Sequence, residues 1–174
     1  NVDSFGHNAM MPQLLTQSGM KCYVIMRPDR NENPDVPENL FWWDSADGSR
    51  VLAYRTPTGY VAHGKEDIDK KLEEINKRVE ETEHGMMMFY GVGNHGGGPT
   101  KGDIEYLKAN LEREGYNELE FSSPDEYFED MLNQFLKIPV WKDELQHHAS
   151  GCYSATSLVK ALNRRAENTL AAAE

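Results

Sequence analysis

Three short stretches of the sequence carry side chains that could do chemistry, and the first, DSFGHN, contains Asp3, Phe5 and His7. An aspartate there can be a nucleophile, an acid or a metal ligand, or it can cap a turn before a helix. Phe5 can stack on a sugar ring or pack in the core, and His7 can bind a metal ion or hydrogen-bond to a carbonyl group. The spacing alone favours the cap for Asp3 and core packing for the other two.

The other two stretches follow expected buried strands. Arg27 follows KCYVIM, and GNHGGG, which contains Asn94 and His95, follows MMMFYGV. In α/β folds, ligands bind at the carboxyl ends of the strands. We therefore expect DSFGHN, Arg27 and GNHGGG to converge on one site. The glycines there either let the backbone approach a ligand closely or form a plain tight turn.

The elements that must position these residues alternate between strand and helix, which predicts an α/β fold. The predicted order is helix 8–18, strand 21–26, hairpin 40–55, helix 65–84, strand 86–92, helix 103–115, strand 119–122 and a helix that starts at Ser123. Trp42 and Trp43 point to opposite faces of their strand, so at least one belongs to the core and the other can be a platform for a sugar.

The pattern changes after Pro139, where one long helical segment from about residue 155 replaces the alternation. We therefore expect residues 1–125 to be the later part of an α/β domain and residues 126–174 to be the incomplete start of a helical bundle. The sequence begins without an initiator methionine and ends without a helix stop signal, which predicts a piece of a larger protein.

Charge and composition exclude several classes of protein. The formal net charge of -11 argues against nucleic-acid binding, which needs a basic face. No apolar run reaches the roughly 18 residues of a membrane span, and no signal peptide is recognisable, so we expect a cytoplasmic protein without membrane contact. Cys22 and Cys152 lie far apart and predict neither a disulfide framework nor a thiolate zinc site.

Taken together, DSFGHNAMMPQLL, Arg27 after a buried strand, FWWDSADGSRVLAYR, YGVGNHGGGPT, LEFSSPDEYF and ELQHHASGCYSATSLVKALNRRAE resemble bacterial α-mannosidases of glycoside hydrolase family 38. The resemblance covers nearly the whole chain in the order of the family. It implies the later part of a (β/α)-barrel-like catalytic domain followed by the start of a helical bundle. It also implies a zinc-dependent retaining exo-α-mannosidase that removes terminal mannose from mannose-containing oligosaccharides.

The resemblance assigns roles to single residues. Asp3 corresponds to the catalytic nucleophile, which also ligates zinc, and Arg27 corresponds to an arginine beside it. Phe5 corresponds to an aromatic residue near the sugar, and Tyr60 corresponds to a site tyrosine that, like Arg27, can hold the carboxylates by hydrogen bonds. Apart from the resemblance, we expect Trp43 to be the tryptophan of the pair that contacts the sugar.

The family's acid/base aspartate is absent from the loop that contains Asn94 and His95. Three alternatives stay open: His95 takes part in proton transfer, Asn94 binds the sugar, or the acid comes from elsewhere.

The family's other zinc ligands come from a His-x-Asp motif upstream and a His-Asp motif downstream, and neither motif is in this sequence. The isolated chain is therefore expected to bind zinc weakly and to be inactive, and its exposed sheet edges favour a homo-oligomer. Two other interpretations are a non-catalytic carbohydrate-binding or helical interaction module, and a metal-dependent deacetylase-like hydrolase with Asp3, His7 and His95 as ligands.

Overall fold

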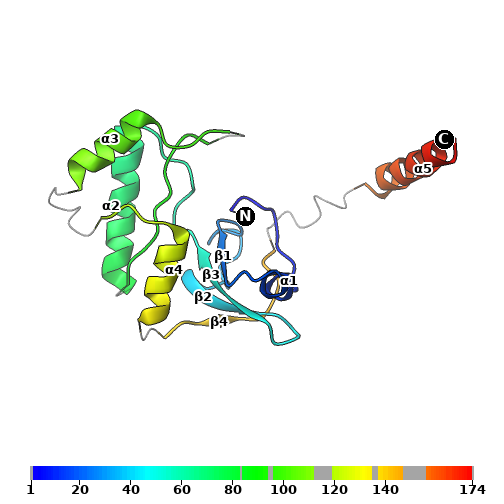
Figure 1. Ribbon diagram of the computed structural model, residues 1–174, viewed down its shortest axis with the longest axis horizontal. Helices are drawn as coiled ribbons and strands as arrows, with labels where there is room; N and C mark the ends of the chain where they lie inside the picture. Colours follow the sequence, from blue (N-terminus) through cyan, green and yellow to red (C-terminus); the bar gives the residue numbers. More distant parts are fainter. Residues whose placement is uncertain are drawn as a thin grey trace.

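A mixed sheet of four strands lies at the centre of the computed structural model (Figure 1). The structure describes residues 2–82, 84–93, 96–111, 119–134, 137–146 and 156–173. The strands are β1 (Cys22–Ile25), β2 (Asn39–Asp44), β3 (Arg50–Arg55) and β4 (Val140–Trp141), and their order in the sheet is β1-β3-β2-β4. β1 is parallel to β3, β4 is parallel to β2, and β2 is antiparallel to β3. The predicted α/β class is confirmed, whereas closure into a barrel stays a prediction.

The β2–β3 hairpin forms as the sequence predicts, because two apolar runs flank the turn residues ADGS. The turn is closed by a hydrogen bond of 2.8 Å from the backbone N–H of Ser45 to the carbonyl oxygen of Ser49. Next to it, the guanidinium of Arg50 donates to both carboxylate oxygens of Asp44, at 2.6 and 2.8 Å. This paired contact helps to fix the register of the two strands at the end next to the turn.

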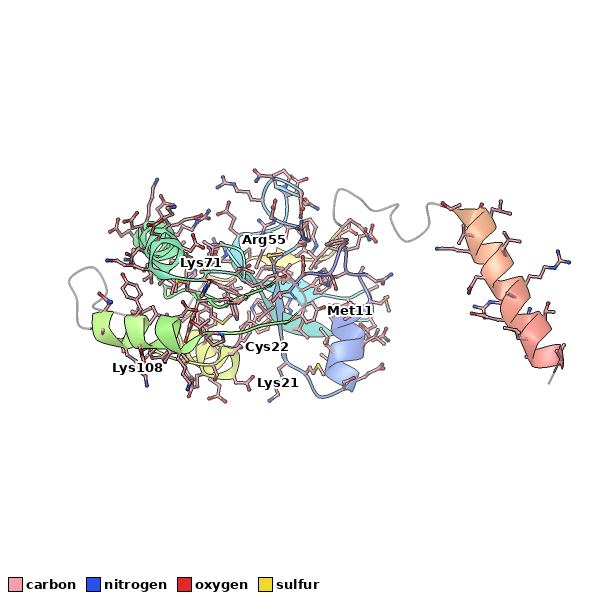
Figure 2. All side chains as sticks on the ribbon, turned by 90° about the horizontal axis from the view of Figure 1, so that it is seen from above. Met11, Lys21, Cys22, Arg55, Lys71 and Lys108 are labelled. Carbon is pink, nitrogen blue, oxygen red and sulfur yellow. The ribbon has the colours of Figure 1, made fainter. Side chains whose placement is uncertain are left out.

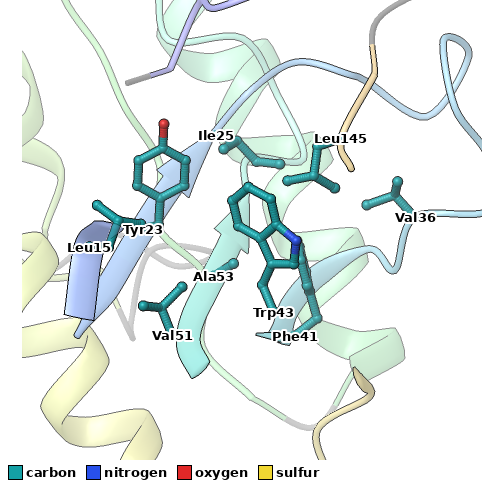
Figure 3. Packing of buried hydrophobic residues seen from close by; sticks show 9 residues of the cluster. All are labelled: Leu15, Tyr23, Ile25, Val36, Phe41, Trp43, Val51, Ala53 and Leu145. Atoms are coloured by element: carbon teal, nitrogen blue, oxygen red, sulfur yellow. The ribbon is translucent and has the colours of Figure 1, made fainter. Parts of the chain in front are cut away.

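Alternating side chains of the sheet build a hydrophobic core on each face. One core, drawn in Figure 3, consists of Leu15, Tyr23, Ile25, Val36, Phe41, Trp43, Val51, Ala53 and Leu145. It includes a residue of α1 (Met11–Gln17). The opposite core consists of Leu40, Leu52, Tyr54, Tyr127, Phe128 and Met131, the last three from α4 (Pro124–Asn133). The sheet is therefore covered by helices on both faces.

Two further helices form a third apolar cluster beside the sheet. They are α2 (Lys65–Thr82) and α3 (Lys101–Asn110), and their cluster is built on Ala62, Ile68, Leu72 and Leu107. The starts of α3 and α4 are fixed by capping boxes, Thr100 with Asp103 and Ser123 with Glu126. The predicted helix start at Ser123 is confirmed. In the part of the chain that the structure describes, we find no helix that could span a membrane.

The expected strand at residues 86–92 is not formed. Over these residues the structure shows one isolated bridge, in which Gly91 pairs with Ala62. The backbone N–H and C=O of Met87 bond to the hydroxyl of Tyr54 at 3.0 and 3.1 Å. Phe89 likewise offers its carbonyl to Lys71, at 2.9 Å. Side chains therefore satisfy the backbone groups that a neighbouring strand would use.

The expected domain boundary between residues 125 and 126 falls inside α4. The apolar face of α4 packs on the sheet, and Leu145 is fully buried in the opposite core. The packing therefore groups the described residues up to Gln146 with the α/β unit. The last helix, α5 (Ser157–Ala173), has no buried residue among its members, so within the described ranges it packs against no other element, and the expected helical bundle stays a prediction.

We expect Phe128→Ala to lower the free energy of unfolding by about 3–5 kcal/mol, because Phe128 is 2% exposed and its removal leaves a cavity between α4 and the sheet. The matched control is Leu132→Ala on the same helix. Leu132 is 49% exposed, so its loss is about 0.5 kcal/mol. Urea unfolding of the chain measures both values. Equal losses would show that α4 does not contribute to the core of the α/β unit.

Candidate functional site

The carboxylate of Asp3 lies between two hydrogen-bond donors from distant parts of the chain. Arg27 donates from Nε to Oδ1 at 2.9 Å, and the hydroxyl of Tyr60 donates to Oδ2 at 3.3 Å. The side chain of Asp3 is 43% exposed, so solvent and ligands can reach it. The structure thus brings together three of the predicted site residues, and the two donors fix the orientation of an accessible carboxylate.

Phe5 lies beside this group. The centre of the Arg27 guanidinium is 5.2 Å from the centroid of the Phe5 ring, and Phe5 is 39% exposed. An aromatic ring on the surface next to a carboxylate is a suitable face for a sugar ring. The expected contact with sugar remains a prediction.

Glu32 holds the guanidinium of Arg27 from its other side. Its Oε1 accepts a hydrogen bond from a terminal nitrogen of Arg27, while its Oε2 accepts from the backbone N–H of Asp29 at 2.9 Å. The hydrogen bond to Asp3 is the main reason why the pKa of Arg27 is raised above its ordinary value, so the guanidinium remains charged. The sequence does not single out Glu32, because it is one of several acidic residues in the polar loop after Arg27.

Arg55 holds the loop that follows Arg27 through hydrogen bonds to its backbone. It ends β3, is 3% exposed, and donates to the carbonyl oxygens of Asn33 at 3.0 Å and Val36 at 2.7 Å. Figure 2 shows its place near the centre of the molecule. A buried guanidinium is tolerated when its donors are bonded, and here the bonds fix the backbone that follows Arg27.

His7 is a structural residue of the site. Its ring is buried, with Nδ1 3.0 Å from the hydroxyl of Tyr23 and Nε2 3.0 Å from the carbonyl oxygen of Arg27. Because a carbonyl oxygen only accepts, Nε2 carries the proton and Nδ1 accepts from Tyr23. Both ring nitrogens are therefore occupied. This confirms the favoured interpretation of His7 as a core residue and argues against the alternative in which it is a metal ligand. The imidazole positions the backbone of Arg27.

Trp43 also differs from the expectation. Its side chain is fully buried, and its indole N–H donates to the carbonyl oxygen of Asp143 at 2.9 Å. A fully buried indole offers no face to a sugar, so Trp43 is a core residue and not a substrate contact. The adjacent Trp42 points to the opposite face and is half-buried, with the guanidinium of Arg50 5.4 Å from its ring. Asn94 and His95 lie outside the described residues.

The described residues do not assemble a metal centre. Over the ranges that the structure describes, no group of three or more histidine, cysteine, aspartate and glutamate side chains could hold a metal ion. Asp3 is a suitable ligand by its chemistry and exposure, but a zinc site needs about four ligands. The part of the chain described here therefore does not fit a zinc ion without ligands from elsewhere.

Comparisons with known proteins identify the family of the chain. The model of the glycosyl hydrolases family 38 N-terminal domain matches residues 1–144. Alpha-mannosidase G of Dictyostelium discoideum is 29% identical over 99% of this chain. Alpha-mannosidase 2C1 of Mus musculus is 30% identical over 97%, and Alpha-mannosidase of Saccharomyces cerevisiae is 29% identical over 95%. The chain spans 16% of the length of each of these relatives.

We expect His7 to make the stability of the chain depend on pH. Burial lowers the pKa of His7 below its ordinary value of 6.5, so on acidification the unfolded chain binds a proton that the folded chain does not. The free energy of unfolding is therefore expected to fall as the pH decreases below about 6.5.

Urea unfolding at about pH 7.5 and about pH 5.5 measures this loss. His7→Gln is expected to show a smaller loss than the wild type, and His84→Gln, at a partly exposed histidine, serves as the control. Equal losses in the wild type and His7→Gln would contradict the neutral, buried state of His7.

Proposed function

The chain belongs to glycoside hydrolase family 38, and from this membership we propose that the protein containing it is a zinc-dependent, retaining exo-α-mannosidase. Its substrates would be glycans with terminal α-mannosyl residues. Two observations support the proposal: relatives that align with nearly the whole chain are named alpha-mannosidases, and the Asp3 carboxylate is accessible and aligned by two donors. The exposed and oriented Asp3 carboxylate is the observation on which the proposed mechanism rests.

In a retaining glycosidase, one carboxylate attacks the anomeric carbon and forms a covalent glycosyl-enzyme, which water then hydrolyses. We assign the attack to Asp3. Arg27 and Tyr60 hold its two oxygens, so that the nucleophile needs little reorientation before it reacts. When Asp3 becomes an ester, its negative charge is lost, and Glu32 still holds Arg27 in place through its own ion pair.

The group that protonates the leaving oxygen is proposed to come from the loop of Asn94 and His95, or from another part of the protein. The chain enters that loop through Gly93, which lies against the Tyr60 segment. A Cβ at Gly93 would lie 2.2 Å from Cγ2 of Val61 and 3.5 Å from Cε2 of Tyr60. A side chain at this position would displace Val61, so the glycine lets the segment before the loop run close to Tyr60, which supports the proposed assignment of the loop to the Asp3 site.

Zinc belongs to the proposal for the whole protein. When bound, the ion would act as a Lewis acid on sugar hydroxyls, with Asp3 as one ligand. The described residues do not form a zinc site by themselves. The roles proposed for Asp3, Arg27 and Tyr60 rest on the hydrogen bonds between their side chains.

We expect Asp3→Asn to reduce hydrolysis of an aryl α-mannoside by the full-length protein by about 10⁴-fold, because an amide cannot replace the nucleophile. The assay uses zinc-supplemented protein and reports kcat/KM. Asp35→Asn, at an exposed aspartate of the neighbouring loop, is the control and should retain full activity. A fully active Asp3→Asn variant would show that the nucleophile lies elsewhere, and a wild type without α-mannosidase activity would refute the proposed function.

The isolated 174-residue chain is expected neither to turn over the aryl mannoside nor to bind zinc tightly. Asp3 alone contributes too little affinity, since zinc affinity depends on the complete set of ligands. Equilibrium dialysis against micromolar zinc measures binding, with the full-length protein as the positive control. Tight, stoichiometric binding by the chain alone would contradict this expectation and favour a self-contained metal centre.

A further inference from the structure

We propose that Lys71 is a positioning residue of the Asp3 site: it holds the loop of Tyr60, and thereby holds the Tyr60 hydroxyl against the Asp3 carboxylate. Lys71 lies on α2 and has no contact with Asp3 among the hydrogen bonds and ion pairs of the described residues. The inference deepens the proposed function and rests on it, because it gives Lys71 a role in the same site.

The side chain of Lys71 points into the molecule. It occupies the buried stripe of α2 that also contains Ile68, Leu72 and Ile75, and it is 8% exposed. A lysine in such a stripe loses the hydration of its ammonium group, which is unfavourable unless acceptors replace the water. The surroundings of Nζ therefore have to supply these acceptors.

Three backbone carbonyls supply them. Nζ donates to the carbonyl oxygens of Gly59, of Val61 at 3.0 Å and of Phe89 at 2.9 Å. An ammonium group has three N–H donors, so the number of donors matches the number of acceptors. Burial lowers the pKa of Lys71 to about 8, which still leaves the ammonium form predominant at neutral pH.

The three carbonyls belong to the two segments that lead to the site. Gly59 and Val61 are the immediate neighbours of Tyr60, so Lys71 clamps the backbone on both sides of this residue. Phe89 lies in the segment that continues to Gly93 and the loop after it. The paired hydrogen bonds between Ala62 and Gly91, at 2.7 and 3.2 Å, join the two segments a few residues further on.

The contact that depends on this clamp is sensitive to small displacements. The hydroxyl of Tyr60 is 3.3 Å from Oδ2 of Asp3, near the outer limit of a hydrogen bond between oxygens. A shift of a few tenths of an ångström in the Tyr60 loop would break it. Asp3 would then keep Arg27 as a donor but lose the restraint on its second oxygen.

The test is a double-mutant cycle with Lys71→Met and Tyr60→Phe in the full-length protein, assayed with an aryl α-mannoside. Each single variant is expected to lower kcat about tenfold, the effect of one lost hydrogen bond, with little change in KM. If Lys71 acts through the Tyr60 hydroxyl, the double variant loses no more than either single variant. Lys70→Met, at an exposed neighbour on α2, should retain the wild-type kcat.

Losses that multiply in the double variant, or a Tyr60→Phe variant with wild-type kcat, would overturn the proposal, because Lys71 would then act only on stability or through another group. Lys71→Gln keeps two N–H donors and replaces Lys71→Met in the cycle if the methionine variant does not fold.

A crystal structure of the Lys71 variant separates this inference from the proposed function. We expect the Tyr60 hydroxyl to lie beyond hydrogen-bond distance of Asp3 in the variant. An unchanged distance would overturn the positioning role, even in an active enzyme. A wild type without α-mannosidase activity would refute the function instead, and the distance in the variant would still decide whether Lys71 positions Tyr60.

Discussion

Two buried cations hold the backbone of the candidate site. Arg55 and Lys71 are 3% and 8% exposed, and both donate hydrogen bonds to backbone carbonyls of neighbouring loops. Arg55 fixes the loop after Arg27, and Lys71 fixes the loop of Tyr60. Loops lack the regular backbone hydrogen bonds of helices and strands. The hydrogen bonds from these two cations take their place and give the loops defined positions.

The sheet provides the fixed points from which these cations act. Arg55 is the last residue of β3, in the middle of the sheet, where it pairs with Ile25 on one side and Asn39 on the other. β1 ends at Ile25, two residues before Arg27. The end of this strand therefore positions both the Arg27 guanidinium, which contacts Asp3, and the Arg27 carbonyl group, which accepts a hydrogen bond from His7. The site therefore inherits its geometry from the end of a strand pair, as ligand sites of α/β folds generally do.

The sequence was most informative where the signal is local or a motif is specific. Apolar runs around a turn predict the β2–β3 hairpin, and the resemblance to a family predicts that Asp3, Arg27 and Tyr60 meet. Lys71 could not be recognised, because in KEDIDKKLEE it looks like one of several solvent-facing charges. Its burial depends on backbone carbonyls from loops that are distant in the sequence, which accept the hydrogen bonds of its ammonium group.

Trp42 and Trp43 show the same limit, since alternation says that they face apart but not which of them faces the better-filled core. The expected strand at 86–92 failed for a related reason. Its apolar composition is that of a strand, but the backbone groups of Met87 and Phe89 bond to the side chains of Tyr54 and Lys71.

The partners of Asp3 are separated from it by 24 and 57 positions along the chain. Such contacts close long loops, and the entropy lost in closing them is offset when the strands between the partners pair. A nascent or partly unfolded chain therefore carries an Asp3 side chain without its two donors. The orientation of the Asp3 carboxylate is therefore tied to completion of the sheet, because both donors reach it only in the native fold.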